Sequence, residues 1–215
     1  MTREYRVVDA GRPAEVFVAL RAALADGGLA VVPRSGGSQV ESGGWPGIGG
    51  RAAQNVALVI ETSGSTGVPK RVALSVDALL ASAAASAGAM GGQGQWLLAL
   101  PAHYVAGAQV LVRSLAAGTE PVYYGEGHFD PLRFAELAAE LDGDQLYTSL
   151  VPVQLARLVE AVEAGAREAG TALRRFDGIL VGGQSLDPRL RERAETLGAR
   201  LSTTYGSSET AGGCV

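Results

Sequence analysis

The chain has 215 residues, of which 47% are hydrophobic and 19% are charged, and its formal net charge is -4. A domain of this size buries about 70% of the surface that its unfolded chain exposes, so one or two globular units are expected. The acidic balance argues against nucleic acid or an anionic membrane as a partner, because binding to either requires a basic surface.

Targeting segments and disulfides are not indicated. The first eleven residues alternate charged and apolar side chains, unlike a secretory signal. No apolar run approaches the ~18 residues of a membrane span. The single cysteine, Cys214, has no partner for an internal disulfide, which suits a reducing compartment. We therefore expect a cytoplasmic protein.

The first fifty residues predict one helix, one strand and a long loop. Over 13–25, Val16, Leu20 and Leu24 lie on one side of a helical wheel. A short apolar strand is expected over 29–33, after two glycines. Residues 34–51 are rich in glycine and serine and are typical of a surface loop or linker.

From residue 55 onward, strand and helix patterns alternate along the chain. Strands are predicted near 56–60, 96–100, 121–124, 145–148, 178–181 and 200–204. Helices are predicted near 76–90, 105–117, 131–141, 152–168 and 188–197. This alternation predicts an α/β fold with a mostly parallel sheet and helices on both of its faces. Ligands in such sheets bind beyond the carboxyl ends of the strands, which directs attention to the loops there.

The segment over 61–70, ETSGSTGVPK, follows an apolar strand and is the first candidate site. Its glycines allow backbone N–H groups to face a phosphate, its hydroxyl groups add donors, and Lys70 adds a positive charge. Its glycine spacing differs from that of the common phosphate loop. The alternative is an ordinary turn. The candidate nucleotide-binding residues here are Thr62, Ser63, Gly64, Ser65, Thr66, Gly67 and Lys70.

Two later loops also follow predicted strands. In TYGSSETAGG, Tyr205 offers an aromatic face for adenine, Ser208 a hydroxyl for a phosphate, and Glu209 a carboxylate for Mg²⁺, which prefers oxygen ligands. The pair Gly182-Gly183 would let a purine and an acyl group approach the backbone. Plain surface turns are the alternative in both places.

The string TSGSTGVPK resembles the phosphate-binding signature of the adenylate-forming superfamily, which includes acyl-CoA synthetases, luciferases and the adenylation domains of peptide synthetases. The resemblance implies catalytic roles for Lys70, Ser208 and Glu209, with Glu209 also as the metal ligand. Arg71 stands where relatives commonly have glycine, and we expect it to add a cation near the phosphate entrance. Further nucleotide contacts implied by the resemblance are Gly182, Gly183, Gln184, Tyr205, Gly206 and Ser208.

A narrower resemblance covers nearly all of residues 56–215. The patterns LPxxxVxGxQVLVRSLxAG and SLVPxQLxRL resemble the o-succinylbenzoate-CoA ligases of menaquinone biosynthesis. An arginine amid apolar residues, as at Arg113, either reaches water or meets a buried anion. Thr148 and Ser149 are expected just past a strand end, before a helix N-terminus that favours anions. The resemblance implies that Arg113 and Ser149 hold the carboxylates of the substrate.

His103 and Tyr104 are further substrate-binding candidates, with one departure from the superfamily pattern. The usual histidine falls at Tyr104, and His103 takes the preceding, usually aromatic place. A structural role for His103 is therefore an equal alternative. This region also shows no aspartate of the kind with which amino-acid-activating relatives bind an amine, which disfavours an amino-acid substrate.

The resemblance implies an ATP-dependent acid-thiol ligase that uses Mg²⁺, forms an acyl-adenylate and passes the acyl group to coenzyme A. Residues 1–215 are expected to form the amino-terminal ATP- and acyl-binding domain, with up to two subdomains. Superfamily members continue with a ribose-binding aspartate and a lid domain carrying a lysine, so we expect an inactive fragment. Another aryl- or acyl-CoA ligase and a non-catalytic adenylate-binding module are the alternatives, and a homo-oligomer is left open.

Overall fold

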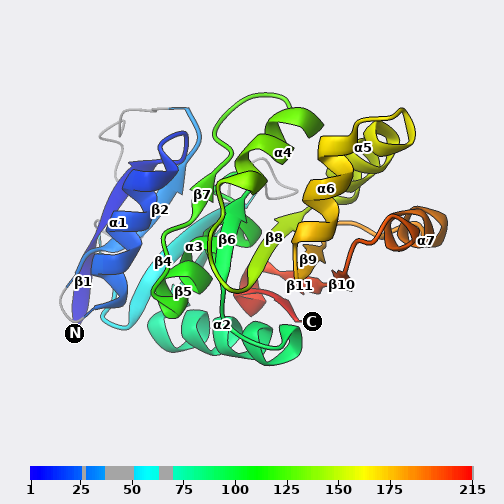
Figure 1. Ribbon diagram of the computed structural model, residues 1–215. Helices are drawn as coiled ribbons and strands as arrows, with labels where there is room; N and C mark the ends of the chain where they lie inside the picture. The colour runs from blue at the N-terminus through cyan, green and yellow to red at the C-terminus, as the bar shows by residue number, and fades with distance from the viewer. Residues whose placement is uncertain (26–27, 37–50, 63–69, 215) are drawn as a thin grey trace.

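The computed structural model describes residues 1–25, 28–36, 51–62 and 70–214, arranged around two five-stranded sheets (Figure 1). The first sheet has the order β3-β1-β2-β4-β5. Within it, β2 pairs in parallel with β1 and β4, whereas β3 and β5 are antiparallel to their neighbours. Its strands are β1 (Thr2–Asp9), β2 (Ala30–Arg34), β3 (Arg51–Ala53), β4 (Val56–Thr62) and β5 (Lys70–Ser75).

The second sheet has the order β10-β9-β8-β6-β7, and all of its strand pairs are parallel. Because the strands are parallel, their carboxyl ends meet at one edge, where the loops considered above emerge. The predicted parallel sheet is thereby confirmed. Its strands are β6 (Gln95–Leu98), β7 (Val122–Tyr123), β8 (Leu146–Leu150), β9 (Gly178–Val181) and β10 (Leu201–Thr203).

Helices cover both faces of the second sheet, as the sequence predicts. On one face, α1 (Pro13–Leu24), α2 (Val76–Met90) and α3 (Val105–Ala117) share a hydrophobic core with residues of both sheets. On the other face lies a second core beneath four helices. These are α4 (Pro131–Ala139), α5 (Pro152–Glu163), α6 (Arg167–Arg175) and α7 (Pro188–Thr196).

Local sequence signals explain the two ends of helix α2 and the break between helices α5 and α6. Helix α2 begins after Ser75, whose side chain accepts a hydrogen bond from the N–H of Ala78 at 3.1 Å, and it ends at Gly91 in a left-handed conformation. The predicted single helix over 152–168 is wrong, because Gly165 has a φ of 100° and separates α5 from α6.

Three strands of the first sheet were missed in the sequence: β1, β3 and β5. Each depends on a partner: β1 pairs with β2 and β3, and β5 runs antiparallel to β4 directly after the glycine-rich loop. The predicted loop over 34–51 begins at the end of β2 and ends in β3, while residues 37–50 lie outside the described part of the chain.

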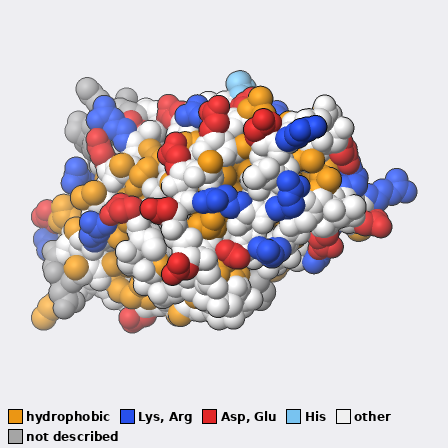
Figure 2. All heavy atoms as spheres, in the orientation of Figure 1, with side chains coloured by type: hydrophobic (Ala, Val, Ile, Leu, Met, Phe, Trp, Pro, Cys, Tyr) orange, Lys and Arg blue, Asp and Glu red, His pale blue; other side chains and the backbone are white. Residues whose placement is uncertain are grey.

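The described chain ends in a hairpin of β11 (Tyr205–Ser207) and β12 (Gly212–Cys214), joined through a 3-10 turn at Ser208–Thr210. On the face in Figure 2, side chains of both charges are interspersed and no large patch of one sign is visible, in keeping with the modest net charge. Among the described helices, none is long and apolar enough to cross a membrane.

Candidate functional site

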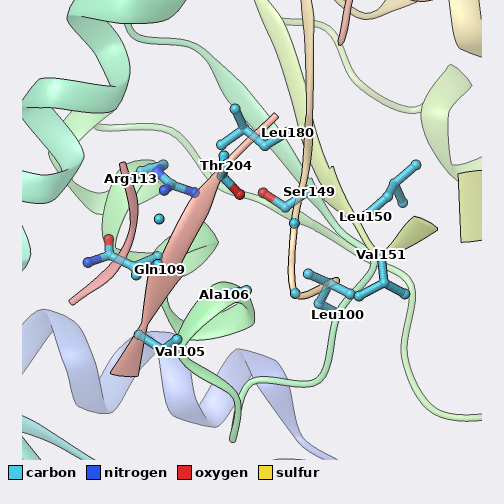
Figure 3. A pocket seen from close by; sticks show the side chains of 15 residues that line it. Leu100, Val105, Ala106, Gln109, Arg113, Ser149, Leu150, Val151, Leu180 and Thr204 are labelled. Carbon is cyan, nitrogen blue, oxygen red and sulfur yellow. The ribbon is translucent and has the colours of Figure 1, made fainter. Parts of the chain in front are cut away.

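A cavity of about 100 Å³ lies at the carboxyl edge of the second sheet (Figure 3). Its wall combines one face of α3, the ends of β8 and β9, and the carboxyl-terminal hairpin. The cavity thus lies where parallel α/β sheets bind ligands. Its polar and glycine lining residues are Gln109, Arg113, Ser149, Gly182, Gly183, Thr204, Gly206, Gly212 and Gly213.

Arg113 is the main charged group of this cavity. The residue is only 6% exposed, and its guanidinium lies 5.0 Å from the ring centroid of Trp96, a cation-π contact. Among the described residues, its Nε has no hydrogen-bond partner and it forms no salt bridge. Burial lowers the pKa of Arg113 to about 10, so the group is still a cation at neutral pH. The alternative that Arg113 reaches out to water is therefore wrong.

Ser149 lines the cavity, and Figure 3 shows the Arg113 side chain directed toward Ser149 and Thr204. The expectation that Thr148 and Ser149 lie past a strand end is wrong, because β8 continues to Leu150. Adjacent strand residues face opposite sides: the Thr148 hydroxyl donates to the Leu97 carbonyl at 2.9 Å, whereas the Ser149 Oγ is buried without a partner in the described structure.

Sequence reasoning missed two lining residues, Gln109 and Thr204. Gln109 is fully buried, and its Nε2 donates to the Ala211 carbonyl at 2.6 Å. Its position four residues before Arg113 puts both on one face of α3, a periodicity that would have found it. Thr204 follows β10, and its backbone N–H donates to the Val181 carbonyl at 2.9 Å. Only this contact with Val181, which forms in the folded chain, places Thr204 in the wall of the cavity.

The Gly-Gly turn lies in the wall of this cavity, and the structure gives a reason for each glycine apart from any ligand. A Cβ on Gly182 would lie 2.2 Å from Thr204 Oγ1, and Gly183 has a φ of 81°. A side chain at 182 would therefore have to displace the Thr204 hydroxyl, whether or not a ligand binds. Gln184 is exposed and does not line the cavity.

Lys70 and Glu209 lie 139 residues apart in the chain and are joined in the structure. Lys70 Nζ donates to Glu209 Oε1 at 2.6 Å, and both side chains are at least half exposed. The hydrogen bond from Lys70 and further bonds from backbone and Ser207 lower the pKa of Glu209 to about 2. Glu209 is therefore an ionised carboxylate at any physiological pH.

The other nucleotide-side candidates have the following places. Tyr205 is 92% exposed, which leaves its ring accessible, and Ser208 is half-buried in the 3-10 turn. Thr62 Oγ1 donates to the Lys70 carbonyl at 3.2 Å across the two strands that flank the loop. The remaining loop candidates lie outside the described residues: Ser63, Gly64, Ser65, Thr66 and Gly67.

Arg71 forms an ion pair with a carboxylate of the neighbouring strand. Its Nε donates to Glu61 at 2.9 Å, and Glu61 also accepts two hydrogen bonds from Arg34 at 2.8 Å. The hydrogen bond from Arg34 is the largest cause of the lowered pKa of Glu61, with Arg71 adding to it. Arg71 thus belongs to a half-buried ion-pair network with Glu61 and Arg34, and the expected cation near the phosphate entrance stays a prediction, because residues 63–69 lie outside the described part of the chain.

His103 and Tyr104 do not join Arg113 and Ser149 in the cavity. They line a neighbouring hollow of about 630 Å³ that shares only Leu100 and Val151 with the smaller cavity. Tyr104 is 57% exposed at the start of α3, with its ring 4.2 Å from that of His103. Burial lowers the pKa of His103, so this side chain is mainly neutral at pH 7.

Magnesium binding can be tested against the side chains present. Within the described residues, no group of three or more His, Cys, Asp or Glu residues could hold a metal ion. Glu209, in the turn of the carboxyl-terminal hairpin, offers an exposed, ionised carboxylate. One carboxylate is enough for Mg²⁺ when water and substrate phosphates complete the shell, so Glu209 fits such an ion.

The fold and the cavity define an α/β protein whose ligand site lies at the carboxyl edge of a parallel sheet. The profile of the AMP-binding enzymes matches residues 28–215, and the chain belongs to this family. The resemblance expected from the loop over 61–70 is thereby confirmed.

Individual relatives show which kind of AMP-binding enzyme the chain is similar to. A probable 2-succinylbenzoate-CoA ligase of Mycobacterium tuberculosis is 41% identical over 169 residues, which cover 78% of this chain and 43% of that protein. The 2-succinylbenzoate-CoA ligase of Salmonella typhimurium is 32% identical, over 73% of this chain and 31% of that protein. The structure of o-succinylbenzoate CoA synthetase from Bacillus subtilis with its acyl-adenylate intermediate has a TM-score of 0.61 and 26% identity, covering 77% of this chain and 41% of that one. The chain thus spans less than half the length of these relatives.

Proposed function

We propose that this chain forms the ATP- and acid-binding part of an acid-CoA ligase, and that its acid is o-succinylbenzoate or a closely similar dicarboxylate. The observation that supports this most directly is Arg113, a buried cation that lines the cavity without an anionic partner in the described structure. The relatives named above, which are o-succinylbenzoate-CoA ligases, support the choice of acid.

A buried, unpaired guanidinium is costly for the ligand-free protein, because desolvation is not offset by an opposite charge. A ligand carboxylate beside Arg113 would remove that cost, and a planar guanidinium binds a carboxylate through two parallel hydrogen bonds. Ser149 adds a buried hydroxyl that has no other partner in the described structure. The apolar lining of Leu100, Val105 and Leu180 suits the hydrocarbon part of an aromatic acid.

The proposed nucleotide site is the exposed surface around Tyr205, Lys70 and Glu209. Tyr205 offers an exposed ring for adenine, and Lys70 a cation for phosphate oxygens. Phosphates would replace Glu209 as the partner of Lys70, which frees the carboxylate for Mg²⁺. The ion would there offset phosphate charge.

The reaction needs no protein nucleophile. A carboxylate oxygen of the acid attacks the α-phosphorus of ATP, pyrophosphate leaves, and an acyl-adenylate forms. The thiolate of coenzyme A then attacks the acyl carbonyl and AMP leaves. The residues of this chain contribute position and charge: Arg113 and Ser149 orient the acid through the carboxylate that does not react, and Lys70 offsets the phosphate charge.

Calorimetry with two stable acyl-adenylate analogues tests the proposal on the chain as it stands. The o-succinylbenzoyl analogue carries the second carboxylate, and the benzoyl analogue is the matched control that lacks it. We expect the first to bind at least tenfold more tightly. Equal affinities would refute the dicarboxylate assignment, and no binding of either analogue would refute the adenylate site itself.

A further inference from the structure

Gln109 holds a buried amide whose two ends have different surroundings. Its Nε2 donates to the Ala211 carbonyl, whereas its Oε1 has no partner among the described residues. The side chain lines the cavity beneath Arg113 in Figure 3. A buried amide that uses only one of its ends is unusual, because an unmet acceptor costs about 1–3 kcal/mol.

The Gln109 hydrogen bond reaches the turn that presents Glu209. Ala211 follows the 3-10 turn and has a φ of 57°, and no other non-glycine residue of the described chain has a positive φ. This conformation is unfavourable for alanine and persists where the surroundings hold it. Gly212 lies against the same side chain, since a Cβ there would be 3.1 Å from Gln109 Cγ. Gln109 therefore supports this turn by both a hydrogen bond and packing.

The same helix face carries the cation of the acid side. Gln109 and Arg113 are one turn apart on α3, and both line the cavity. The free Oε1 is an acceptor and cannot bond the carboxylate that Arg113 is proposed to bind, and the amide nitrogen is held by its bond to Ala211. Gln109 thus differs from Arg113 in task while being held on the same rigid element.

We propose that Gln109 is a positioning residue that fixes the hairpin of Tyr205 and Glu209 to helix α3 and thereby sets the nucleotide side of the site relative to Arg113. The expected effect on nucleotide binding rests on the proposed function. The link between Gln109 and the hairpin, a hydrogen bond and packing, is present in the ligand-free protein. Loss of the link should loosen the hairpin, weaken nucleotide binding, and leave contacts to the acid carboxylate intact.

Hydrogen exchange and AMP calorimetry on the chain test this link. The variants are Gln109→Leu and Gln109→Met, which keep the volume but remove the donor. The matched control is Ser114→Ala, which removes another buried hydrogen bond of α3, from Ser114 Oγ to the Val110 carbonyl at 3.0 Å, away from the hairpin. We expect exchange over 205–214 to accelerate at least tenfold and AMP binding to weaken about tenfold in both Gln109 variants only.

The ratio of the affinities for the o-succinylbenzoyl and benzoyl analogues should stay within twofold of wild type in the Gln109 variants. Unchanged exchange over 205–214, or acceleration spread evenly over the chain or equal in Ser114→Ala, would overturn the positioning role. A collapse of the affinity ratio would overturn it as well, since Gln109 would then act on the acid. If wild type does not bind AMP, the proposed function fails, and the exchange comparison still decides the link.

Discussion

The cavity around Arg113 and the surface around Lys70 and Glu209 differ in how their charged groups are compensated. Arg113 is buried and lacks an anionic partner in the described structure, whereas Lys70 and Glu209 are exposed and pair with each other. An exposed ion pair contributes little to stability because water screens it, whereas a buried cation without a partner lowers the stability of the ligand-free protein. On the proposed function, a ligand anion would remove the cost in the cavity, and the surface pair would exchange partners when a nucleotide binds.

The largest difference between the two regions is expected for Arg113→Met. This change removes a buried charge while keeping much of the side-chain volume, so the free energy of unfolding of the ligand-free protein should not fall. Affinity for the o-succinylbenzoyl adenylate analogue should fall by about 2–5 kcal/mol, because the ligand carboxylate loses its partner. Calorimetry and thermal unfolding measure the two quantities.

The matched control for this variant is Arg133→Met. Arg133 also lies over an aromatic ring, 4.9 Å from the centroid of Tyr124, but outside the cavity. It should leave ligand affinity unchanged. A similar loss of affinity in both variants, or a clear loss of stability in Arg113→Met, would show that Arg113 has a structural role.

Lys70→Ala tests the surface half. A charge-assisted contact to a phosphate contributes about 1.5–3 kcal/mol, and we expect AMP or ATP binding to weaken by that amount while thermal stability changes little. Lys70 is the only lysine of the sequence, so selective lysine methylation with and without nucleotide gives an independent readout. The matched control is Arg12→Ala, which also removes one positive charge and breaks an exposed ion pair, with Glu15. Equal nucleotide affinity in wild type and Lys70→Ala would remove Lys70 from the site.

Ser149→Ala should have a smaller effect in the cavity. Its Oγ has no partner to lose, so stability should hold, while affinity for the dicarboxylate analogue should fall by about 0.5–1.5 kcal/mol. Thr148→Val is the inverse control, because it loses the hydrogen bond to Leu97 and should lower stability without changing affinity. Reversal of these two results would mean that Ser149 does not face the ligand.

The smallest effect concerns protons at Glu209. Its pKa is depressed from 4.5 to about 2, so any stability that its ionised form contributes is present above pH 4.5 and is lost as pH falls through about 2. Carbon-detected NMR of the carboxyl group should show no titration between pH 7 and 3. In Lys70→Ala the pKa should move back toward 4.5. Titration of wild type near 4.5 would mean that the pair does not persist in solution.

The features that could be predicted from the sequence depend on residues that lie close together in the chain. The bounds of α2 and α3 agree with the sequence pattern, because Ser75 and Gly91 cap one of them and apolar periodicity marks both. The loop over 61–70 identified the family because its residue order is specific. By contrast, β1, β3 and β5 depend on partners that are distant in sequence or reached across a loop, and the break at Gly165 depends on one left-handed glycine.

The sequence by itself determined the fold class, the phosphate-loop motif and the presence of a lone arginine in an apolar helix, since each is a pattern of neighbouring residues. Only the tertiary structure decided that Arg113 is buried in one cavity with Ser149, that His103 lies in a different hollow, and that Arg71 bonds to Glu61. It also joined Lys70 to Glu209 and Gln109 to Ala211. The physical reason is that burial and hydrogen-bond partners are set by which chain segments pack together, a choice made over the whole molecule.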